Sequence, residues 1–442
     1  MLNNFFHLED LNTSLKQEFI GGATTFMTMA YIIFVQPTVL SAAGMDFGAV
    51  IIATCLASTA AMLIMGFYAN YPIALAPGMG QNFFFTYTVV LTMGVPWEKA
   101  LGAVFIAGVV FVALSFFGFR EKIINAIPDS LKYSIAAGIG FMITFIGLEW
   151  GGLVIDHPTL LVTLGDFSRS DTQLTLAGLL ITSVLLIRHV RGAMLIGIMI
   201  GTALGLVLGL IEYNGIFSAP PPISPTFFKL DIGGALSFDL LAVVFTFLIL
   251  DLFDTIGTLI GVAGEAGFLK NGKLPGAEKA LLSDAIGTVV GALLGTSTVT
   301  SYVESASGVA SGARSGLATI FTALLFVLAI FLYPLIAMIG GGVEISEGLR
   351  SYPTVAPILI LVGVYMIKSV KKIPWEDLSE SIPSFITIIF ILFSFRITEG
   401  IALGFISYSL LKLFSGRVKE VPWMMWLFTI IFILRYMFVI ID

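Results

Sequence analysis

The 442-residue sequence is poor in charged side chains and in cysteine. Asp, Glu, Lys and Arg together make up 11% of the chain, against about 25% in an average soluble protein. The single cysteine, Cys55, excludes an internal disulfide and a cysteine-based metal site. His7, His157 and His189 lie outside the middle of the long apolar runs, which argues against a histidine metal cluster within a membrane. The basic residues are dispersed, so no nucleic-acid-binding patch is expected.

Several functional motifs are also missing. There is no phosphate-binding loop of the Walker type, which argues against ATP-driven transport. No ladder of arginines suggests a voltage sensor, and no Ser–His or His–metal arrangement suggests an enzyme. The polar first residues, 1–17, do not read as a cleavable signal. We therefore expect neither catalysis nor a cofactor.

Apolar residues dominate the chain, at 57% of the total. They form repeated runs of about 17 to 25 residues, the length at which a helix crosses a bilayer, and the runs lack the alternation of a membrane barrel. We expect an all-α polytopic membrane protein without a sizeable soluble domain. The predicted spans are 18–42, 48–69, 74–92, 98–118, 129–153, 172–188, 193–211, 236–262, 277–295, 297–313, 315–339, 352–368, 382–397 and 399–414. A further apolar segment, 421–440, suits either an extra span or a helix at the membrane surface.

The distribution of basic residues predicts the orientation of the chain. With these spans, most lysines and arginines fall in loops on the side of the N-terminus. The opposite loops hold only Lys99, Arg169, Lys229 and Arg350. Because basic loops stay in the cytoplasm, we expect a multi-pass protein of the cell membrane with a cytoplasmic N-terminus.

A polar, proline-rich loop, 212–235, divides the predicted spans into two sets of seven. An odd number of spans in each half turns the second half upside down relative to the first. The segments YPIALAPGMGQN (71–82) and LGTSTVTSYVES (294–305) interrupt the third span of each half with extended, polar sequence. Interrupted spans at matching positions indicate a transporter binding site.

The first interrupted span carries Pro72 and Pro77, which remove backbone donors, and Gly78 and Gly80, which permit close approach. The functional interpretation is a broken helix whose free N–H groups, with the Asn82 amide, meet a ligand. The alternative is a proline kink in an ordinary span. The matching break in the second half favours the functional interpretation.

Three acidic residues lie within the apolar runs, where placing a carboxylate in the membrane costs free energy. Asp251 and Asp254 lie three apart on one helical face of the run 245–264, and Glu304 lies at the joint after the second extended segment. Structural alternatives are a carboxylate bonded to hydroxyls of a neighbouring helix, or an acid that caps its own helix. We favour a role in binding or proton coupling for Glu304 and for at least one of the aspartates.

Other polar and aromatic residues receive weaker interpretations. Phe83 is a candidate for stacking on a flat substrate, although most phenylalanines are expected to face lipid or the core. Asp284 lies among Ser and Thr and is expected to be structural. Arg396 and Glu399 are expected to form an ion pair or to reach outward at a helix boundary.

Several of these motifs resemble one known family. They are APGMGQN, DLFDTIGTLIGV, ALLSDAIGTVVGALLGTSTVTSYVESASGVASGARSGL and ITEGIALGFISY. They resemble the AzgA-type purine permeases, a branch of the nucleobase–ascorbate transporter superfamily, over nearly the whole chain. The string GTSTVTSYVES is the most specific of these matches.

The resemblance implies a fold of fourteen spans in two inverted repeats of seven. Spans 3 and 10 would each hold a short β-strand, and the two strands would pair antiparallel. A core domain would comprise 18–118 (spans 1–4) and 236–339 (spans 8–11). A gate domain would comprise 129–211 (spans 5–7) and 352–414 (spans 12–14). A homodimer formed through the gate domains is also an expectation from the resemblance.

The family implies uptake of guanine, hypoxanthine or adenine with protons, by an elevator-type exchange between two open states. Roles carried over by position would give the purine site Asn82, Asp251, Asp254 and Glu304, with Gly80, Gln81, Phe83 and Val303 beside them. Asp254 or Glu304 would be the coupling acid. Carboxylates accept the N–H groups of a purine, while amides meet its carbonyl or ring nitrogens.

Two departures bear on the substrate. The family commonly reads GMGLNAFF where this chain reads GMGQNFFF, so Gln81 replaces an apolar residue and Phe83 a small one. We favour guanine and hypoxanthine, because an acid at 251 suits the N1–H of 6-oxopurines. The alternatives are an adenine-preferring or sodium-coupled permease, and an anion carrier or channel on the same fold. An acid at the joint after the second extended segment argues against anions.

Overall fold

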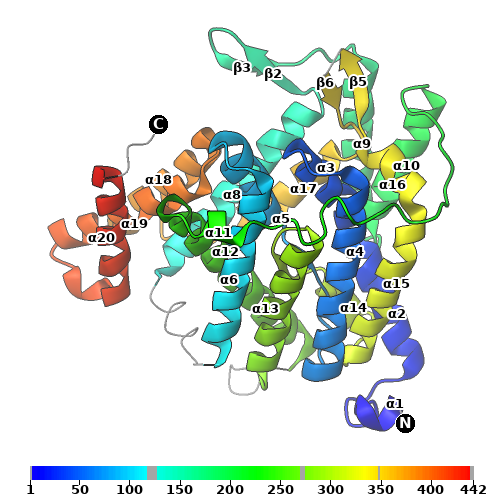
Figure 1. Cartoon of the computed structure of the whole chain (residues 1–442), viewed down its shortest axis with the longest axis horizontal. Helices are drawn as coiled ribbons and strands as arrows, with labels where there is room; N and C mark the ends of the chain where they lie inside the picture. The colour runs from blue at the N-terminus through cyan, green and yellow to red at the C-terminus, as the bar shows by residue number, and fades with distance from the viewer. Residues whose placement is uncertain (1, 117–126, 269–273, 347–348, 439–442) are drawn as a thin grey trace.

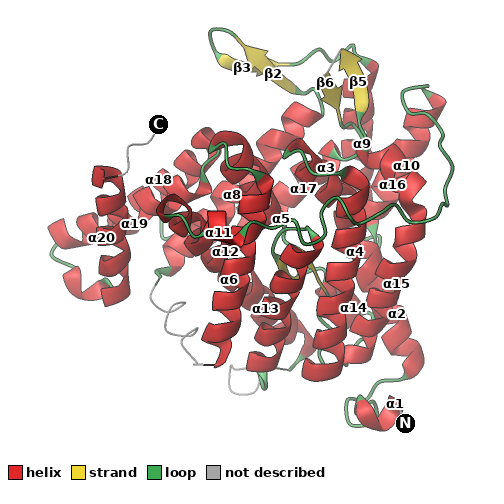
Figure 2. Cartoon of the chain, viewed as in Figure 1, coloured by secondary structure: helices red, strands yellow, loops and turns green. Residues whose placement is uncertain are grey.

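The computed structural model describes residues 2–116, 127–268, 274–346 and 349–438 and is mainly helical (Figures 1 and 2). Residues 117–118 and 439–440, which end two of the predicted apolar segments, lie outside the described residues. The first half contains α1 (Leu2–Phe5), α2 (Leu15–Met29), α3 (Ile32–Ala42), α4 (Phe47–Ile64), α5 (Met79–Phe83), α6 (Trp97–Phe116), α8 (Asp129–Trp150), α9 (Ser170–Ile187) and α10 (Ala193–Val207). The second half contains α11 (Ile232–Ala235), α12 (Phe238–Ala266), α13 (Ala277–Leu294), α14 (Ser305–Ala310), α15 (Gly316–Ala329), α16 (Tyr333–Gly340), α17 (Ala356–Ile367), α18 (Leu378–Ser394), α19 (Ile397–Phe414) and α20 (Trp423–Phe438).

The long helices coincide with the predicted apolar segments. Within the described residues, eight helical segments are long and apolar enough to cross a membrane, and three shorter apolar helices accompany them. Of the remaining predicted spans, 74–92 and 297–313 are interrupted, and 277–295 forms the continuous 18-residue helix α13. The spans 193–211, 352–368 and 382–397 form helices of 15, 12 and 17 residues. The helical, multi-pass architecture is therefore confirmed, while the count of fourteen stays a prediction.

Spans 3 and 10 meet through the predicted strands. Strand β1 (Leu75–Pro77) pairs antiparallel with β4 (Val299–Ser301), and Ala76 lies opposite Thr300. Backbone bonds extend the pairing at both ends: Gly78 N–H donates to the Thr298 carbonyl, and Tyr302 N–H donates to the Ala74 carbonyl. Such irregular backbone is tolerated at this depth because the strands satisfy each other's polar groups within the protein.

Two further hairpins were not expected from the sequence. Strand β2 (Val154–His157) pairs with β3 (Leu161–Leu164), and β5 (Val343–Ser346) pairs with β6 (Leu349–Ser351). Both lie at the end of the molecule opposite the N-terminus (Figure 1). They belong to connections between helices and do not contribute to the buried ribbon.

Helical geometry also changes inside three of the apolar segments. The first segment breaks between α2 and α3, at Ala30 and Tyr31. The second and third end in wider, π-helical turns over Met65–Ala69 and Phe84–Thr92. Such irregular turns in helices are frequent at functional sites.

The helices pack into two groups. Helices α2, α4, α6, α13 and α15 pack on one another, and α8, α17, α18 and α19 form a second set of mutual contacts. Within the first group, the buried carboxylate of Glu18 accepts hydrogen bonds from the backbone N–H groups of Arg314, Ser315 and Ala318 at the start of α15. This acid therefore caps a helix of the other half of the chain, which the helix dipole favours.

Candidate functional site

Two threonine hydroxyls connect β4, one strand of the β1–β4 ribbon, to helices α12 and α13. The Thr288 hydroxyl of α13 lies within hydrogen-bonding distance of the Val299 carbonyl of β4 (2.9 Å) and of Asp251 Oδ2 (3.2 Å). The Thr255 hydroxyl of α12 lies 2.8 Å from Asp284 Oδ1 and 2.9 Å from the Thr300 hydroxyl. Each of the two helices thus presents an Asp and, one turn later, a Thr to the other. This reciprocal arrangement fixes β4 against α12 and α13.

A cavity of about 580 Å³ lies where the ribbon meets the second helix group. Gly78 and Gly80 contribute to it from the first interrupted span, and Val303 and Glu304 from the second. Asp254 of α12 lines it as well. The opposite wall comes from residues 189–194, before and at the start of α10, and from Val362, Tyr365 and Met366 of α17. Two acidic side chains therefore face a space shared by both groups of helices.

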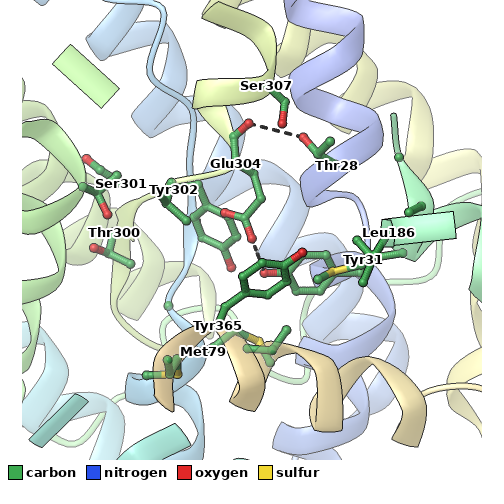
Figure 3. A pocket seen from close by; sticks show the side chains of 18 of the residues that line it. Thr28, Tyr31, Met79, Leu186, Thr300, Ser301, Tyr302, Glu304, Ser307 and Tyr365 are labelled. Atoms are coloured by element: carbon green, nitrogen blue, oxygen red, sulfur yellow. Dashed lines mark hydrogen bonds between the residues drawn. The ribbon is translucent and has the colours of Figure 1, made fainter. Parts of the chain in front are cut away.

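Glu304 stands immediately before α14, at the joint that follows β4. Tyr31 donates a hydrogen bond of 2.7 Å to its carboxylate Oε1. The hydroxyl of Thr28 lies 3.4 Å from the Glu304 backbone carbonyl. Figure 3 shows the side chains of Tyr31 and Glu304 pointing toward each other and joined by a hydrogen bond, with Thr28 beside the backbone of Glu304. Sequence reasoning identified Glu304 but missed Tyr31, whose apolar surroundings give no polar signal.

Asp254 is exposed to the cavity and receives a hydrogen bond from Gln81. The Gln81 amide nitrogen lies 3.3 Å from Asp254 Oδ2, and the Gln81 side chain is almost fully buried. A Cβ atom at Gly78 would lie 2.1 Å from the Gln81 Oε1 atom, so glycine is required there for Gln81 to take this position. Gln81 therefore contacts the acid from behind and is not among the residues that line the cavity.

Asn82 is fully buried, away from the cavity lining. Its amide nitrogen donates a 2.6 Å bond to Gln36 Oε1. The amide of Gln36 in turn donates to the hydroxyls of Thr296 and Ser297 at 2.9 Å each. Asn82 thus belongs to a polar network that joins α3, α5 and the segment entering β4.

Each of the remaining predicted site residues either lines the cavity or lies in the layer that supports it. Asp251 is buried on α12 beside Thr288, and Phe83 is buried and stacked on Tyr87. Neither lines the cavity, whereas Gly80 and Val303 do. The structure therefore brings Gly80, Asp254, Val303 and Glu304 together at one surface. It places Gln81, Asn82, Phe83 and Asp251 in the layer that supports it.

The acid Glu399 pairs with a residue that the sequence analysis had not matched to it. Arg435 of α20 donates to Glu399 Oε1 at 2.6 Å, and the Tyr436 hydroxyl donates to its other oxygen. The expected ion pair thus forms with Arg435 and not with Arg396. It joins the C-terminal helix α20 to α19.

A second charged network lies at the ends of α18 and α19. Arg417 bonds to Asp377 at 2.5 Å and to Glu420 at 2.7 Å, and the buried Lys412 ammonium lies 2.8 Å from Glu420. The Ser379 hydroxyl and Arg417 lower the pKa of Asp377 to about 2. Arg417 and Lys412 lower the pKa of Glu420 to about 2. None of these residues lines the cavity, and the network joins the α19–α20 connection to the start of α18.

In the part of the chain that the structure describes, no cluster of His, Cys, Asp or Glu could hold a metal ion. The cavity lining instead includes two acidic residues, several residues with hydroxyl groups, and Gly78 and Gly80 at a joint of the ribbon. These groups accept and donate hydrogen bonds in a shared, partly apolar space. The arrangement suits a small, flat ligand with polar edges.

The chain is similar to known permeases over most of its length. A model described as a permease family matches residues 16–403. A guanine/hypoxanthine permease of Bacillus subtilis, PbuG, is 44% identical over 99% of this chain and 100% of its own length. An adenine permease of Escherichia coli, AdeP, is 42% identical over 99% of this chain and 96% of its own.

A solved structure shows the same fold. The transmembrane domain of the cyanobacterial bicarbonate transporter BicA superposes with a TM-score of 0.65, covering 87% of this chain and 97% of that domain at 15% identity. At this identity the likeness concerns the fold alone. The family match and the relatives show that this is a transporter and not an enzyme. The chain belongs to this permease family, in its AzgA-type purine nucleobase branch.

Proposed function

We propose that this protein imports purine nucleobases, with hypoxanthine and guanine preferred, by symport with protons. The observation that carries the proposal is the pair of carboxylates, Asp254 and Glu304, facing one cavity at the joint of two interrupted helices. A 6-oxopurine is flat and neutral and presents N–H donors on both of its rings. Each carboxylate can accept one such donor, while Gly80 and Val303 line the same surface.

The predicted site residues that do not line the cavity position the groups that do. Asn82 and Asp251 hold the ribbon and α12 through buried hydrogen bonds, and Gln81 holds Asp254. In this proposal they act on the substrate through the groups that they position. Phe83, which is fully buried, stacks on Tyr87 within the third span and does not stack on the base.

Proton symport requires an acid that takes up a proton outside and releases it inside together with the substrate. Asp254 and Glu304 are the candidates because both face the cavity. Movement of the ribbon-bearing helix group past the second group would carry the cavity across the membrane, as in an elevator. The N-terminus would lie in the cytoplasm, where the bias of basic loops favours it.

An anion carrier on the same fold is the main competitor. The cavity lining includes His189 and Arg191, yet the residues at the joints of the ribbon are acidic or neutral. An anion bound between Asp254 and Glu304 would face like charge. This arrangement favours a neutral substrate that donates hydrogen bonds.

Uptake of radiolabelled hypoxanthine by cells that lack their own purine permeases tests the proposal. We expect competition by guanine and, more weakly, by adenine, and none by uracil or sulfate. A protonophore should abolish accumulation, while replacing sodium with potassium should leave it unchanged. Uptake that persists after collapse of the proton gradient would contradict proton symport. Absence of purine uptake in cells that express the protein would contradict the substrate assignment.

A further inference from the structure

Tyr31 occupies the break between α2 and α3 in the first apolar segment. The backbone turns more tightly there, because Ile33 N–H donates to Ala30 and Phe34 N–H donates to Tyr31, each three residues back. The side chain is 2% exposed and lines the cavity. The break thus directs a phenol from the first span toward the joint after β4.

The phenol contacts the carboxylate of Glu304 and not its backbone. The bond to Glu304 Oε1 is 2.7 Å long (Figure 3). Within the described residues, Tyr31 is the one side chain that donates a hydrogen bond to this carboxylate. A neutral donor satisfies one oxygen of the acid, and a carboxylate has a second oxygen that can accept a hydrogen bond from a ligand.

We infer that Tyr31 is a positioning residue for Glu304: its hydroxyl fixes the carboxylate in the orientation that receives the purine. This inference rests on the proposed function. The Tyr31 hydroxyl donates a hydrogen bond to Glu304, just as the Gln81 amide donates one to Asp254. Each of the two cavity acids therefore has its own neutral donor, and the two donors come from different spans.

Other groups around Glu304 act on it without this contact. The titratable and charged groups that share its cavity are Asp254 of α12, Tyr302 beside the ribbon, Tyr365 of α17, and His189 and Arg191 before α10. Tyr302 donates its hydroxyl to the Pro77 carbonyl instead of to an acid. It therefore offers a matched control for removal of a tyrosine hydroxyl in the same cavity.

The test is binding of radiolabelled hypoxanthine to the purified full-length protein, measured from about pH 5 to about pH 9. Wild type is compared with Tyr31→Phe and Tyr302→Phe, and the amount of folded protein is checked by size-exclusion chromatography. In Tyr31→Phe we expect about tenfold weaker binding at neutral pH, because a hydrogen bond to a charged group is lost. The pH at which binding is half-maximal should move upward by about one pH unit. In Tyr302→Phe that midpoint should stay at the wild-type value.

A second variant, Glu304→Asp, shortens the acid and withdraws it from the Tyr31 phenol while keeping a carboxylate. It should move the midpoint in the same direction as Tyr31→Phe. Equal midpoints in wild type and in both Tyr31→Phe and Glu304→Asp would overturn the inference. Failure of the wild type to bind hypoxanthine would instead reject the proposed function, so the two failures are distinguishable.

Discussion

Gln81 is a departure from the common family pattern, and its contact gives that departure a function. It supplies a hydrogen bond to Asp254 from a buried position behind the cavity. Replacement by the usual leucine keeps the volume but removes the donor. We predict that Gln81→Leu raises the KM for hypoxanthine by about tenfold with a smaller change in maximal rate, because Asp254 loses its fixed orientation.

The control for this prediction is Gln173→Leu, the same replacement at an exposed glutamine that bonds to the carbonyls of Phe167 and Ser168. It should leave the KM unchanged. Both variants are measured by initial rates of hypoxanthine uptake at equal membrane abundance. A wild-type KM in Gln81→Leu would show that the contact with Asp254 has no part in binding.

Individual acids were predictable from the sequence, but their neighbours were not. Asp254 and Glu304 interrupt apolar runs, and a carboxylate in such a place is costly enough to be noticed. Tyr31 suits an apolar segment, so its type carries no signal. Asn82 and Asp254 were both polar candidates, yet only Asp254 lines the cavity. A helix as short as α5 offers too little periodicity to reveal which of its faces is covered.

The ribbon depends on hydroxyl contacts from the helices that flank it. Thr288 contacts both the Val299 carbonyl and Asp251. We predict that Thr288→Val destabilises the protein by about 2 kcal/mol, because it leaves buried acceptors without this donor. The melting temperature in detergent should fall, and hypoxanthine affinity should fall with it because β4 carries the joint at Glu304.

Thr159→Val, at an exposed position in the turn of the β2–β3 hairpin, is the matched control. Its melting temperature should equal that of the wild type. If Thr288→Val melted at the same temperature and bound hypoxanthine normally, the threonine contacts would not be what holds the ribbon.

The charged network at the ends of α18 and α19 predicts a dependence of stability on pH. The folded-state pKa values of Asp377 and Glu420 are lowered to about 2, below their unfolded values of about 4. Their stabilising contribution is therefore complete above about pH 4 and is lost as the pH falls toward about 2. We predict that Arg417→Ala lowers the melting temperature near neutral pH and makes its decline toward about pH 3 shallower.

Melting curves of the purified protein at a series of pH values check this prediction. Lys419→Ala, at an exposed position nearby, should retain the wild-type profile. Parallel declines for Arg417→Ala and wild type would mean that the ion pairs of Arg417 do not contribute to stability in solution.

Interrupted helices were predictable wherever the sequence breaks the apolar pattern. Pro72, Pro77 and the polar run before Glu304 predicted both strands of the ribbon, and their antiparallel pairing was an implication of the resemblance that the structure confirms. The π-helical turns and the break at Tyr31 carry no comparable signal. The two outer hairpins were missed because short strands in loops lack a long alternating pattern.

At the scale of the whole chain, both halves contribute residues to the cavity. Neither half alone contains the cavity, since β1 and β4 come from different halves and the opposite wall comes from both. Sequence periodicity predicted the helices, and the odd number of predicted spans in each half suggested an inverted repeat. The face that each helix presents depends on long-range packing, which a single sequence does not reveal. The division into core and gate domains stays a prediction that the two packing groups support.

The central claim is that one purine binds between Asp254 and Glu304. Its most direct test is equilibrium binding of radiolabelled hypoxanthine to purified wild type and Glu304→Gln, with Glu399→Gln as a control for loss of a buried acid outside the cavity lining. We predict saturable binding by the wild type, displaced by guanine and not by sulfate, and at least about tenfold weaker binding by Glu304→Gln. Equal affinity in wild type and Glu304→Gln would contradict the account.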